Sequence, residues 1–275
     1  MCLGLDPDPS TFSPDDAPGA DFTDVADRAA AAAFEHCRRL IEQAGPACVA
    51  VKPQLACFER LGAPGWRALA EVCEAARRAG LLVVADGKRG DVPVTARAYG
   101  EALVGETQTP WGPVTGLGAD AFTANPLLGE DATGVLVDAA EAAGAGVFLL
   151  VRTSNPGAAR LQDAQLGEAP LYEELAALVA EGAPRLAGES GLSGLGAVVG
   201  ATAPEHLGRL RELMPDSVFL IPGIGAQGGR PEDLGGALAA GRPASILVAA
   251  ARSIAEADDP AAAAEELRAS VWSLG

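Results

Sequence analysis

The chain has 275 residues, 49% of them hydrophobic and 21% charged, which is enough to bury the core of one large domain. Its formal net charge of −17 at pH 7 disfavours nucleic acid and anionic membranes as partners, because both are themselves negative. No apolar run approaches the roughly 20 residues of a membrane span, and the first residues show no secretory signal pattern. We therefore expect a cytoplasmic protein with neither nucleic-acid nor membrane partners.

The five cysteines and two histidines do not form a recognisable metal or disulfide pattern. The cysteines are odd in number, lack CxxC spacing and lie in apolar surroundings, which favours reduced and mostly buried thiols. Neither His36 nor His206 has a second His or Cys at ligand spacing. The sequence therefore predicts neither a zinc site nor a histidine-based catalytic triad.

Along the chain, eight short apolar runs alternate with eight helix-like segments. The predicted strands are Cys2–Leu5, Cys48–Val51, Leu81–Ala85, Ala119–Ala124, Gly146–Val151, Leu195–Gly200, Val218–Ile221 and Ser245–Ala250. The predicted helices are Asp24–Ala44, Leu55–Ala79 with an interruption near Gly62–Gly65, Val92–Val104, Asp131–Ala143, Leu171–Leu186, Pro204–Leu213, Pro231–Ala240 and Pro260–Leu274. Residues 105–117, rich in Gly, Pro and Thr, are expected to form a loop.

None of the predicted strands alternates between apolar and polar residues, so each is expected to be buried on both faces, as in a parallel sheet. Eight β/α units in a chain of this length predict an α/β protein with the (β/α)8 TIM-barrel fold, which typically takes about 250 residues. A doubly wound open sheet is the alternative, since a sequence counts strands but does not show closure. Without a linker or a break in composition, residues 1–275 are expected to form a single domain.

Charged residues follow several of the predicted strands. Asp6 and Lys52 follow the first two strands, Asp86 and Lys88 follow the third with Asp91 just beyond, and Asn125 follows the fourth. Arg152, Thr153 and Ser154 follow the fifth, and Arg252 and Ser253 follow the eighth. In a TIM barrel the active site lies at these carboxyl ends of the strands.

A single charge at a strand end is more often part of a salt bridge than a catalyst. Four together, Asp6, Lys52, Asp86 and Lys88, predict an array in which lysines keep the carboxylates ionised and carboxylates keep the lysines protonated. Such an array suits the delivery of a proton to a developing carbanion and the electrostatic repulsion of a substrate carboxylate.

The segment Pro222–Gly229 contains a G-x-G-x-x-G pattern at Gly223, Gly225 and Gly228. A dinucleotide site is disfavoured, because that pattern belongs in an early βαβ unit with an acidic residue about 20 positions later. A phosphate site fits better, since loops after the seventh and eighth strands of TIM barrels often bind phosphate. Arg252, at the end of the eighth strand, would add a forked cation beside it.

Seven segments in this order resemble the orotidine 5′-phosphate decarboxylase family, in the longer type 2 form found in many bacteria. They are LGLDPDP at the first strand, VKPQ at the second, ADGKRGDVPVT at the third, ADAFTANPLLG at the fourth, RTSNPGA at the fifth, PGIGAQGG at the seventh and AARSI at the eighth. The resemblance covers nearly the whole chain and includes the family's Asp-x-Lys-x-x-Asp signature at Asp86, Lys88 and Asp91.

The resemblance implies a metal-free carbon–carbon lyase that converts orotidine 5′-phosphate to UMP and CO2 in pyrimidine biosynthesis, without an organic cofactor. Lys88 would protonate C6 of the pyrimidine as CO2 leaves, while Asp86 would lie against the departing carboxylate. Lys52 would hold the ribose and orient Asp86, and Asp6 would bind a ribose hydroxyl. Asp91 is the last residue of the Asp-x-Lys-x-x-Asp signature. The residues expected to be catalytic are therefore Lys88, Asp86, Lys52 and Asp91.

The resemblance also implies how the rest of the substrate is bound. Asp91 and Thr95 would cross the interface of a homodimer into the neighbouring site, and Ser154 would hydrogen-bond the pyrimidine edge. The phosphate would be held by Gln227, Gly228 and Arg252, and Asn125 would complete the set of substrate-binding residues. The segments 152–168 and 226–230 are the candidate lids.

Two features depart from the family pattern. The chain begins almost at its first strand, where relatives usually carry a preceding helical segment, so either the start is misassigned or that extension is absent and the bottom of the barrel is less well covered. The alanines Ala249, Ala250 and Ala251 precede Arg252 where small polar residues are common in the family, so a hydrogen bond to the phosphate is expected to be missing.

Two other functions compete with the decarboxylase. A sister enzyme on the same barrel, acting on sugar phosphates with Mg²⁺, would share the Asp-x-Lys-x-x-Asp signature but place an additional acid on the second strand, where this chain has Lys52. A non-catalytic protein that binds phosphorylated metabolites would lack a member of the charged array. The sequence favours the decarboxylase over both.

Overall fold

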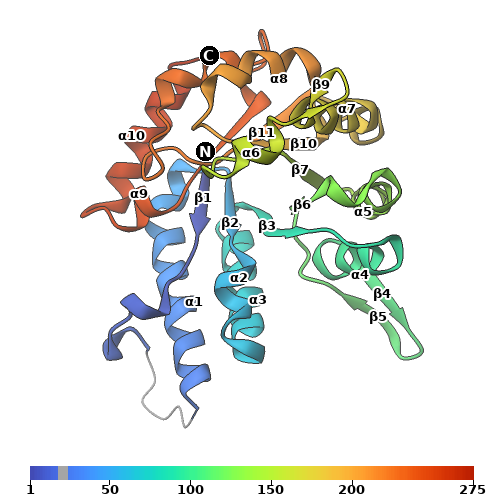
Figure 1. Cartoon of the computed structure of the whole chain (residues 1–275). Coiled ribbons are helices and arrows are strands. Elements are labelled where there is room, and N and C mark those ends of the chain that lie inside the picture. Colours follow the sequence, from blue (N-terminus) through green and yellow to red (C-terminus); the bar gives the residue numbers. More distant parts are fainter. Residues whose placement is uncertain (18–23) are drawn as a thin grey trace.

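The protein is a closed barrel of eight parallel strands, seen in a computed structural model that describes residues 1–17 and 24–275 (Figure 1). The strands follow one another around the barrel in the order β1-β12-β11-β10-β7-β6-β3-β2. Their bounds are β1 (Cys2–Leu5), β2 (Ala50–Pro53), β3 (Leu82–Arg89), β6 (Ala121–Ala124), β7 (Gly146–Arg152), β10 (Ser193–Val199), β11 (Ser217–Ile221) and β12 (Ile246–Ala250). The predicted TIM barrel is confirmed, and the open sheet is wrong.

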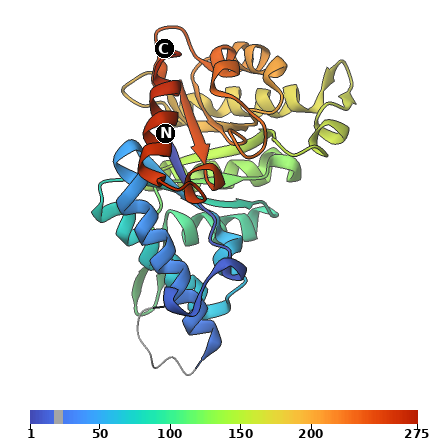
Figure 2. The same ribbon diagram turned by 90° about the vertical axis from the view of Figure 1, so that its left-hand side faces the viewer.

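Helices connect the strands and cover the outside of the barrel. They are α1 (Val25–Ala44), α2 (Leu55–Glu59), α3 (Gly62–Arg78), α4 (Pro93–Leu103), α5 (Glu130–Ala143), α6 (Ala158–Gln162), α7 (Leu171–Gly182), α8 (Leu207–Leu213), α9 (Arg252–Ala255) and α10 (Pro260–Trp272). Asp24 caps α1 by accepting a hydrogen bond of 2.8 Å from the N–H of Ala26. α10 packs beside α1, and both chain ends lie in the upper half of Figures 1 and 2, the C-terminus near the top edge and the N-terminus closer to the middle.

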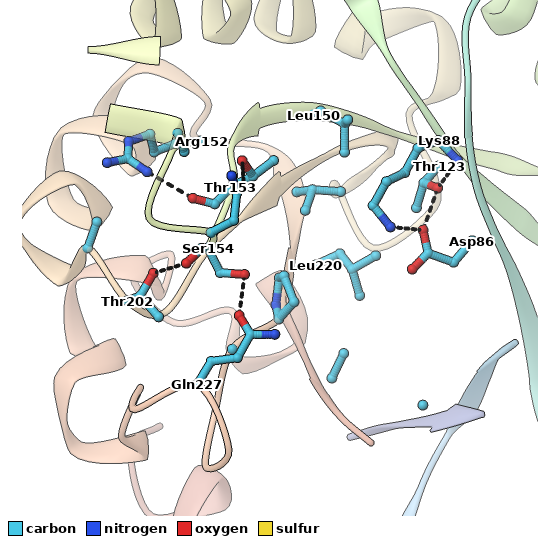
Figure 3. Close-up of a pocket in the computed structure, with 18 of the residues that line it drawn as sticks. Asp86, Lys88, Thr123, Leu150, Arg152, Thr153, Ser154, Thr202, Leu220 and Gln227 are labelled. Carbon is cyan, nitrogen blue, oxygen red and sulfur yellow. Dashed lines mark hydrogen bonds and ion pairs between the residues drawn. The ribbon is translucent and has the colours of Figure 1, made fainter. Parts of the chain in front are cut away.

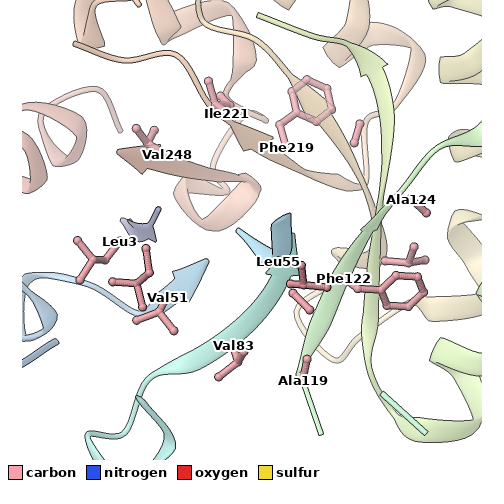
Figure 4. Packing of buried hydrophobic residues seen from close by; sticks show 14 of the residues in the cluster. Leu3, Val51, Leu55, Val83, Ala119, Phe122, Ala124, Phe219, Ile221 and Val248 are labelled. Atoms are coloured by element: carbon pink, nitrogen blue, oxygen red, sulfur yellow. The ribbon is translucent and has the colours of Figure 1, made fainter. Parts of the chain in front are cut away.

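The core has two layers, because successive side chains of a strand point to opposite faces. The inner layer takes one buried apolar residue from each of the eight strands, and it consists of Cys2, Ala50, Val84, Ala121, Phe148, Val198, Leu220 and Ala249. Their neighbours point outward and pack under the helices, including Leu3, Val51, Val83, Phe122, Phe219 and Val248 (Figure 4). Residues two positions beyond the inner layer therefore face the barrel axis again, at its carboxyl end.

Three predicted elements differ from the structure. Residues 105–117 contain a hairpin of β4 (Glu106–Thr109) and β5 (Gly112–Thr115), which projects from the barrel beside α4 in Figure 1. The segment predicted as an α-helix over Pro231–Ala240 is a 3₁₀ helix over Pro231–Ala237, with Gly235 and Gly236 weakening any longer helix. The third strand continues past Ala85 to Arg89, so its charged residues belong to the strand itself.

The cysteine prediction is confirmed in outline. All five are free, with Cys2, Cys37 and Cys73 buried and Cys48 and Cys57 half-buried. Burial raises the pKa of the Cys2 thiol to about 12, so this thiol is inert near neutral pH. Of the helices in the described ranges, none combines the length and the apolar character that crossing a bilayer requires.

Candidate active site

A cavity of about 1020 Å³ opens at the carboxyl ends of the barrel strands. Inner-layer residues such as Leu220 contribute to its lining, together with residues that lie two positions beyond the inner layer and point back toward the barrel axis. Lys52 follows Ala50 in this way, Asp86 follows Val84, and Thr123 follows Ala121. The polar residues predicted at the ends of the first four strands, from Asp6 to Asn125, all line this cavity except Asp91.

Asp86 lies at the centre of the charged group and is only 4% exposed. Its Oδ2 accepts hydrogen bonds from Lys52 Nζ at 2.6 Å and from Gln54 Nε2 at 3.2 Å. Its Oδ1 accepts from Lys88 Nζ at 2.7 Å and from Thr123 Oγ1 at 2.8 Å (Figure 3). Both oxygens of the carboxylate are therefore occupied by donors, two of them cationic.

The charges of this group stabilise one another. Burial alone would raise the pKa of Asp86, but the ammonium groups of Lys52 and Lys88 lower it well below its ordinary value. Burial alone would lower the pKa of Lys52, but the charges of Asp86 and Asp6 raise it above its ordinary value. At neutral pH Asp86 is thus ionised and Lys52 protonated, as the sequence predicted for such an array.

Lysine occurs at only two positions in the whole chain, Lys52 and Lys88, and the other 18 basic residues are arginines. Both lysines contact the same carboxylate. A lysine offers a compact ammonium that can give up a proton, whereas arginine stays protonated in proteins. The scarcity of lysine is thus a second signal in the sequence, independent of the position of these two residues at strand ends.

Thr123 and Gln54 belong to the site, although the sequence did not single them out. Thr123 is 1% exposed, and besides donating to Asp86 it accepts a hydrogen bond of 2.9 Å from the N–H of Lys88. Gln54 follows Lys52 by two residues, so it points to the same side of the strand. Both residues lie an even number of positions from an inward-facing residue of the same strand, and this spacing could have identified them from the sequence.

A second polar group lies on the opposite side of the cavity, with Leu150 and Leu220 between the two (Figure 3). Ser154 Oγ donates to Gln227 Oε1 at 2.7 Å, and Thr202 Oγ1 donates to the carbonyl of Ser154 at 2.8 Å. These three residues come from the loops after β7, β10 and β11. The cavity thus has one polar side around Asp86, an apolar middle and a second polar side around Ser154.

The glycine-rich loop and Arg252 lie on this second side. Gly223, Gly225 and Gly228 all have positive φ angles of 75° to 99°, a backbone region in which glycine is favoured. Arg252 is exposed, begins α9 and lines the cavity together with Gln227. Gly228 is not part of the lining, and its N–H donates to the carbonyl of Gly225 at 2.8 Å.

Arg152 holds the loop after β7 in place. Its side chain is buried, and its Nε and Nη2 donate to the two carboxylate oxygens of Asp163 at 2.7 and 3.1 Å. Gln162 Oε1 accepts from the N–H of Thr153 at 2.8 Å. The candidate lid 152–168 is therefore tied to the barrel through its short helix α6.

Asp91 and Thr95 lie away from the cavity of their own chain. Asp91 Oδ1 accepts a hydrogen bond of 2.7 Å from the N–H of Val92, and Thr95 is exposed in the first turn of α4. The side chains of Val92 and Val94 beside them are 55% and 84% exposed. Leu128, also exposed, comes close to Gly90 at the end of β3.

The donor set around Asp86 is dominated by cations rather than by acids. Across residues 1–17 and 24–275, no cluster of three or more His, Cys, Asp and Glu side chains has an arrangement suited to a metal ion. Asp86 is surrounded by two ammonium groups, an amide and a hydroxyl, and these donate to the oxygens that a divalent cation would need.

Comparisons of the sequence and of the structure with known proteins point to the same family. Residues 1–267 match the model of the orotidine 5′-phosphate decarboxylase / HUMPS family. The orotidine 5′-phosphate decarboxylases of Rhodopirellula baltica and Deinococcus radiodurans are each 39% identical to the chain, over 90% and 92% of its length and 80% and 83% of theirs. The structure of Leishmania donovani OMP decarboxylase is 36% identical, with a TM-score of 0.74 over 99% of this chain and 92% of that one.

Proposed function

The chain belongs to the orotidine 5′-phosphate decarboxylase / HUMPS family, and from this premise we propose that it converts orotidine 5′-phosphate to UMP and CO2. It would thus act as a carbon–carbon lyase in pyrimidine biosynthesis. The observation that carries the proposal is the buried carboxylate of Asp86 between the ammonium groups of Lys52 and Lys88, inside the cavity at the carboxyl end of the barrel.

In the reaction, the bond between C6 of the pyrimidine and its carboxyl carbon breaks, and the electron pair stays on C6. Lys88 Nζ gives a proton to C6, and the neutral amine regains one from water. A vinyl carbanion has no electron sink within the pyrimidine, so fixed charge must stabilise it, and the Lys88 ammonium supplies that charge. The side chain of Lys88 is half-exposed to the cavity, so its ammonium is accessible to a bound substrate.

Asp86 would act on the ground state of the substrate. Because Lys52 and Lys88 keep it ionised, its negative charge would repel the substrate carboxylate that lies against it. Loss of CO2 removes this repulsion, so the interaction favours the transition state over bound substrate. Lys52 and Asp6 would hold the ribose hydroxyls on the same side of the cavity.

Remote groups would bind the rest of the substrate. Ser154 would hydrogen-bond the pyrimidine edge, and Arg252 with Gln227 and Gly228 would hold the phosphate. The N–H of Gly228 already donates within the loop, so its part in binding would require the loop to rearrange when the phosphate arrives. The free energy of phosphate binding can thus drive the rearrangement of this loop and complete the site around the reacting pyrimidine.

A homodimer would complete the site. Asp91 and Thr95 do not line their own cavity, and the neighbouring side chains of Val92 and Val94 are exposed, as is Leu128 near Gly90. Large exposed apolar side chains near one another are compatible with a protein interface. In the proposed dimer, Asp91 and Thr95 reach into the partner's cavity.

The Mg²⁺-dependent sugar-phosphate enzyme remains the alternative, and the test discriminates between the two. We would follow the loss of orotidine 5′-phosphate absorbance by the purified protein in EDTA, and separately test sugar phosphates with Mg²⁺. The proposal predicts turnover of orotidine 5′-phosphate at the same rate in EDTA and in Mg²⁺. Folded protein that leaves this substrate unchanged, or that needs the metal to turn it over, contradicts the proposal.

A further inference from the structure

The backbone around Lys88 departs from regular strand geometry. Lys88 has a φ of +48°, the one positive φ among non-glycine residues in the described ranges. This left-handed conformation is unfavourable for a residue with a Cβ atom and persists only where its surroundings hold it. Something at this position must therefore hold the main chain of the proposed proton donor.

The pairing of β3 with β6 shows which residue is placed to do this. Ala85 pairs with Phe122 and Arg89 pairs with Ala124, so the residues 86–88 lie opposite Thr123 alone. A bulge of this kind leaves backbone groups without their regular ladder partners. The N–H of Lys88 donates instead to the hydroxyl of Thr123, at 2.9 Å.

The same hydroxyl reaches the carboxylate that holds the lysine side chain. An N–H can only donate, so Thr123 Oγ1 accepts from Lys88 and directs its own hydrogen to Asp86 Oδ1, 2.8 Å away. Oδ1 in turn accepts from Lys88 Nζ at 2.7 Å (Figure 3). A closed ring of hydrogen bonds thus joins the main chain of Lys88 to its own ammonium.

We propose that Thr123 is a positioning residue for the proton donor: its buried hydroxyl fixes both the backbone of Lys88 and the carboxylate oxygen that holds the Lys88 ammonium. Its catalytic consequence rests on the proposed function. The positioning itself does not, because it concerns the geometry of the free protein. A misplacement of about 1 Å in a reacting group can cost on the order of a hundredfold in rate.

The first test compares Thr123→Val, which keeps the shape and deletes both hydrogen bonds, with Thr123→Ser, which keeps the hydroxyl. We expect kcat for orotidine 5′-phosphate to fall about 10- to 100-fold in the valine variant, with KM changed by less than about twofold. The serine variant should regain most of kcat. The matched control is Thr133→Val. It removes the hydroxyl of a buried threonine in α5, which donates to the carbonyl of Gly129 just before that helix, and it should leave kcat unchanged.

The second test needs no turnover and uses the two-lysine composition of the chain. Protein labelled with ¹³C at lysine Cε should give two NMR signals, and Lys88→Arg identifies which one belongs to Lys88. In the Thr123→Val variant we expect the Lys88 signal to shift or broaden and the Lys52 signal to stay in place, with the parental spectrum restored in Thr123→Ser.

An unchanged Lys88 signal in Thr123→Val overturns the proposal, as does a serine variant that behaves like the valine variant in either test. A fall in kcat/KM caused by KM alone also overturns it, because that pattern indicates lost substrate binding rather than a misplaced donor. If the parent protein does not turn over orotidine 5′-phosphate, the proposed function fails, while the NMR comparison still decides whether Thr123 positions Lys88.

Discussion

At the scale of single residues, Asp86 connects stability with the charges of the site. Replacement by Asn leaves the buried ammonium of Lys52 without its carboxylate, which should lower the free energy of unfolding at pH 7 by about 3 kcal/mol. Urea unfolding of Asp86→Asn measures this. The control is Asp27→Asn, which breaks an exposed pair with Arg67 and should cost less than about 1 kcal/mol.

The same pair makes a prediction about pH. The folded protein lowers the pKa of Asp86 below its ordinary value of 3.8, so this carboxylate adds stability above pH 3.8 that is lost as pH falls further. Lys52, whose pKa is raised, adds stability below its ordinary value of 10.5 that is lost as pH rises through its higher folded value. The stability difference between parent and Asp86→Asn should therefore be constant near neutral pH and shrink below pH 3.8. A difference that grows in acid contradicts this assignment.

At the scale of elements, an ion pair between Arg152 and Asp163 helps to hold the short helix α6 against the barrel. Five residues are too few for a stable helix in isolation, and buried Arg152 anchors this one through Asp163. Asp163→Asn should therefore free the loop, raise KM for orotidine 5′-phosphate, and speed tryptic cleavage after the exposed Arg160 roughly tenfold. Asp138→Asn, which breaks an exposed pair with Arg185, should change neither quantity. Unaltered cleavage in Asp163→Asn would show that the loop is held by other contacts.

At the scale of the whole molecule, the proposed dimer predicts that two inactive variants restore each other. Lys88→Ala lacks the proton donor but still carries Asp91, while Asp91→Ala keeps Lys88. Unfolded together and refolded in equal amounts, they should recover about a quarter of the parental activity, because half of the dimers are mixed and each has one complete site. Absence of recovery, with a sedimentation mass that confirms dimers, would contradict the exchange of Asp91 between subunits.

Much of the barrel could be predicted, because a buried parallel strand appears in the sequence as a short apolar run and its carboxyl end as the polar residues that come next. Apolar runs located all eight barrel strands, and the polar residues that follow them, such as Lys52 and Asn125, were correctly expected to meet in one place. Thr123 was missed because a threonine inside a β run is ordinary, and its partners depend on a bulge in the neighbouring strand. The hairpin at 105–117 was missed because its Gly, Pro and Thr content is typical of loops.

Arg152 shows a different limit of prediction from sequence. It lies at the carboxyl end of a barrel strand, near the site residues, yet its guanidinium is satisfied by Asp163 instead of being free for a substrate. Arg152 and Asp163 are 11 positions apart, and a loop joins them. The course of a loop cannot be predicted from the spacing of apolar residues, so the sequence did not indicate this pair. A position at a strand end predicts that a residue lies near the active site. Whether its side chain can bind substrate depends on its hydrogen-bond partners, which are known only from the folded structure.

The most direct test of the proposed mechanism is the decarboxylation rate of Lys88→Ala beside that of the parent, both in EDTA and followed by the loss of orotidine 5′-phosphate absorbance. We predict that kcat falls by at least about a thousandfold, because the variant loses both the proton donor and the charge that stabilises the carbanion. Binding of UMP should persist, since the phosphate and ribose groups are untouched. A Lys88→Ala variant that retains UMP binding and turns over within tenfold of the parent would contradict the central role of Lys88.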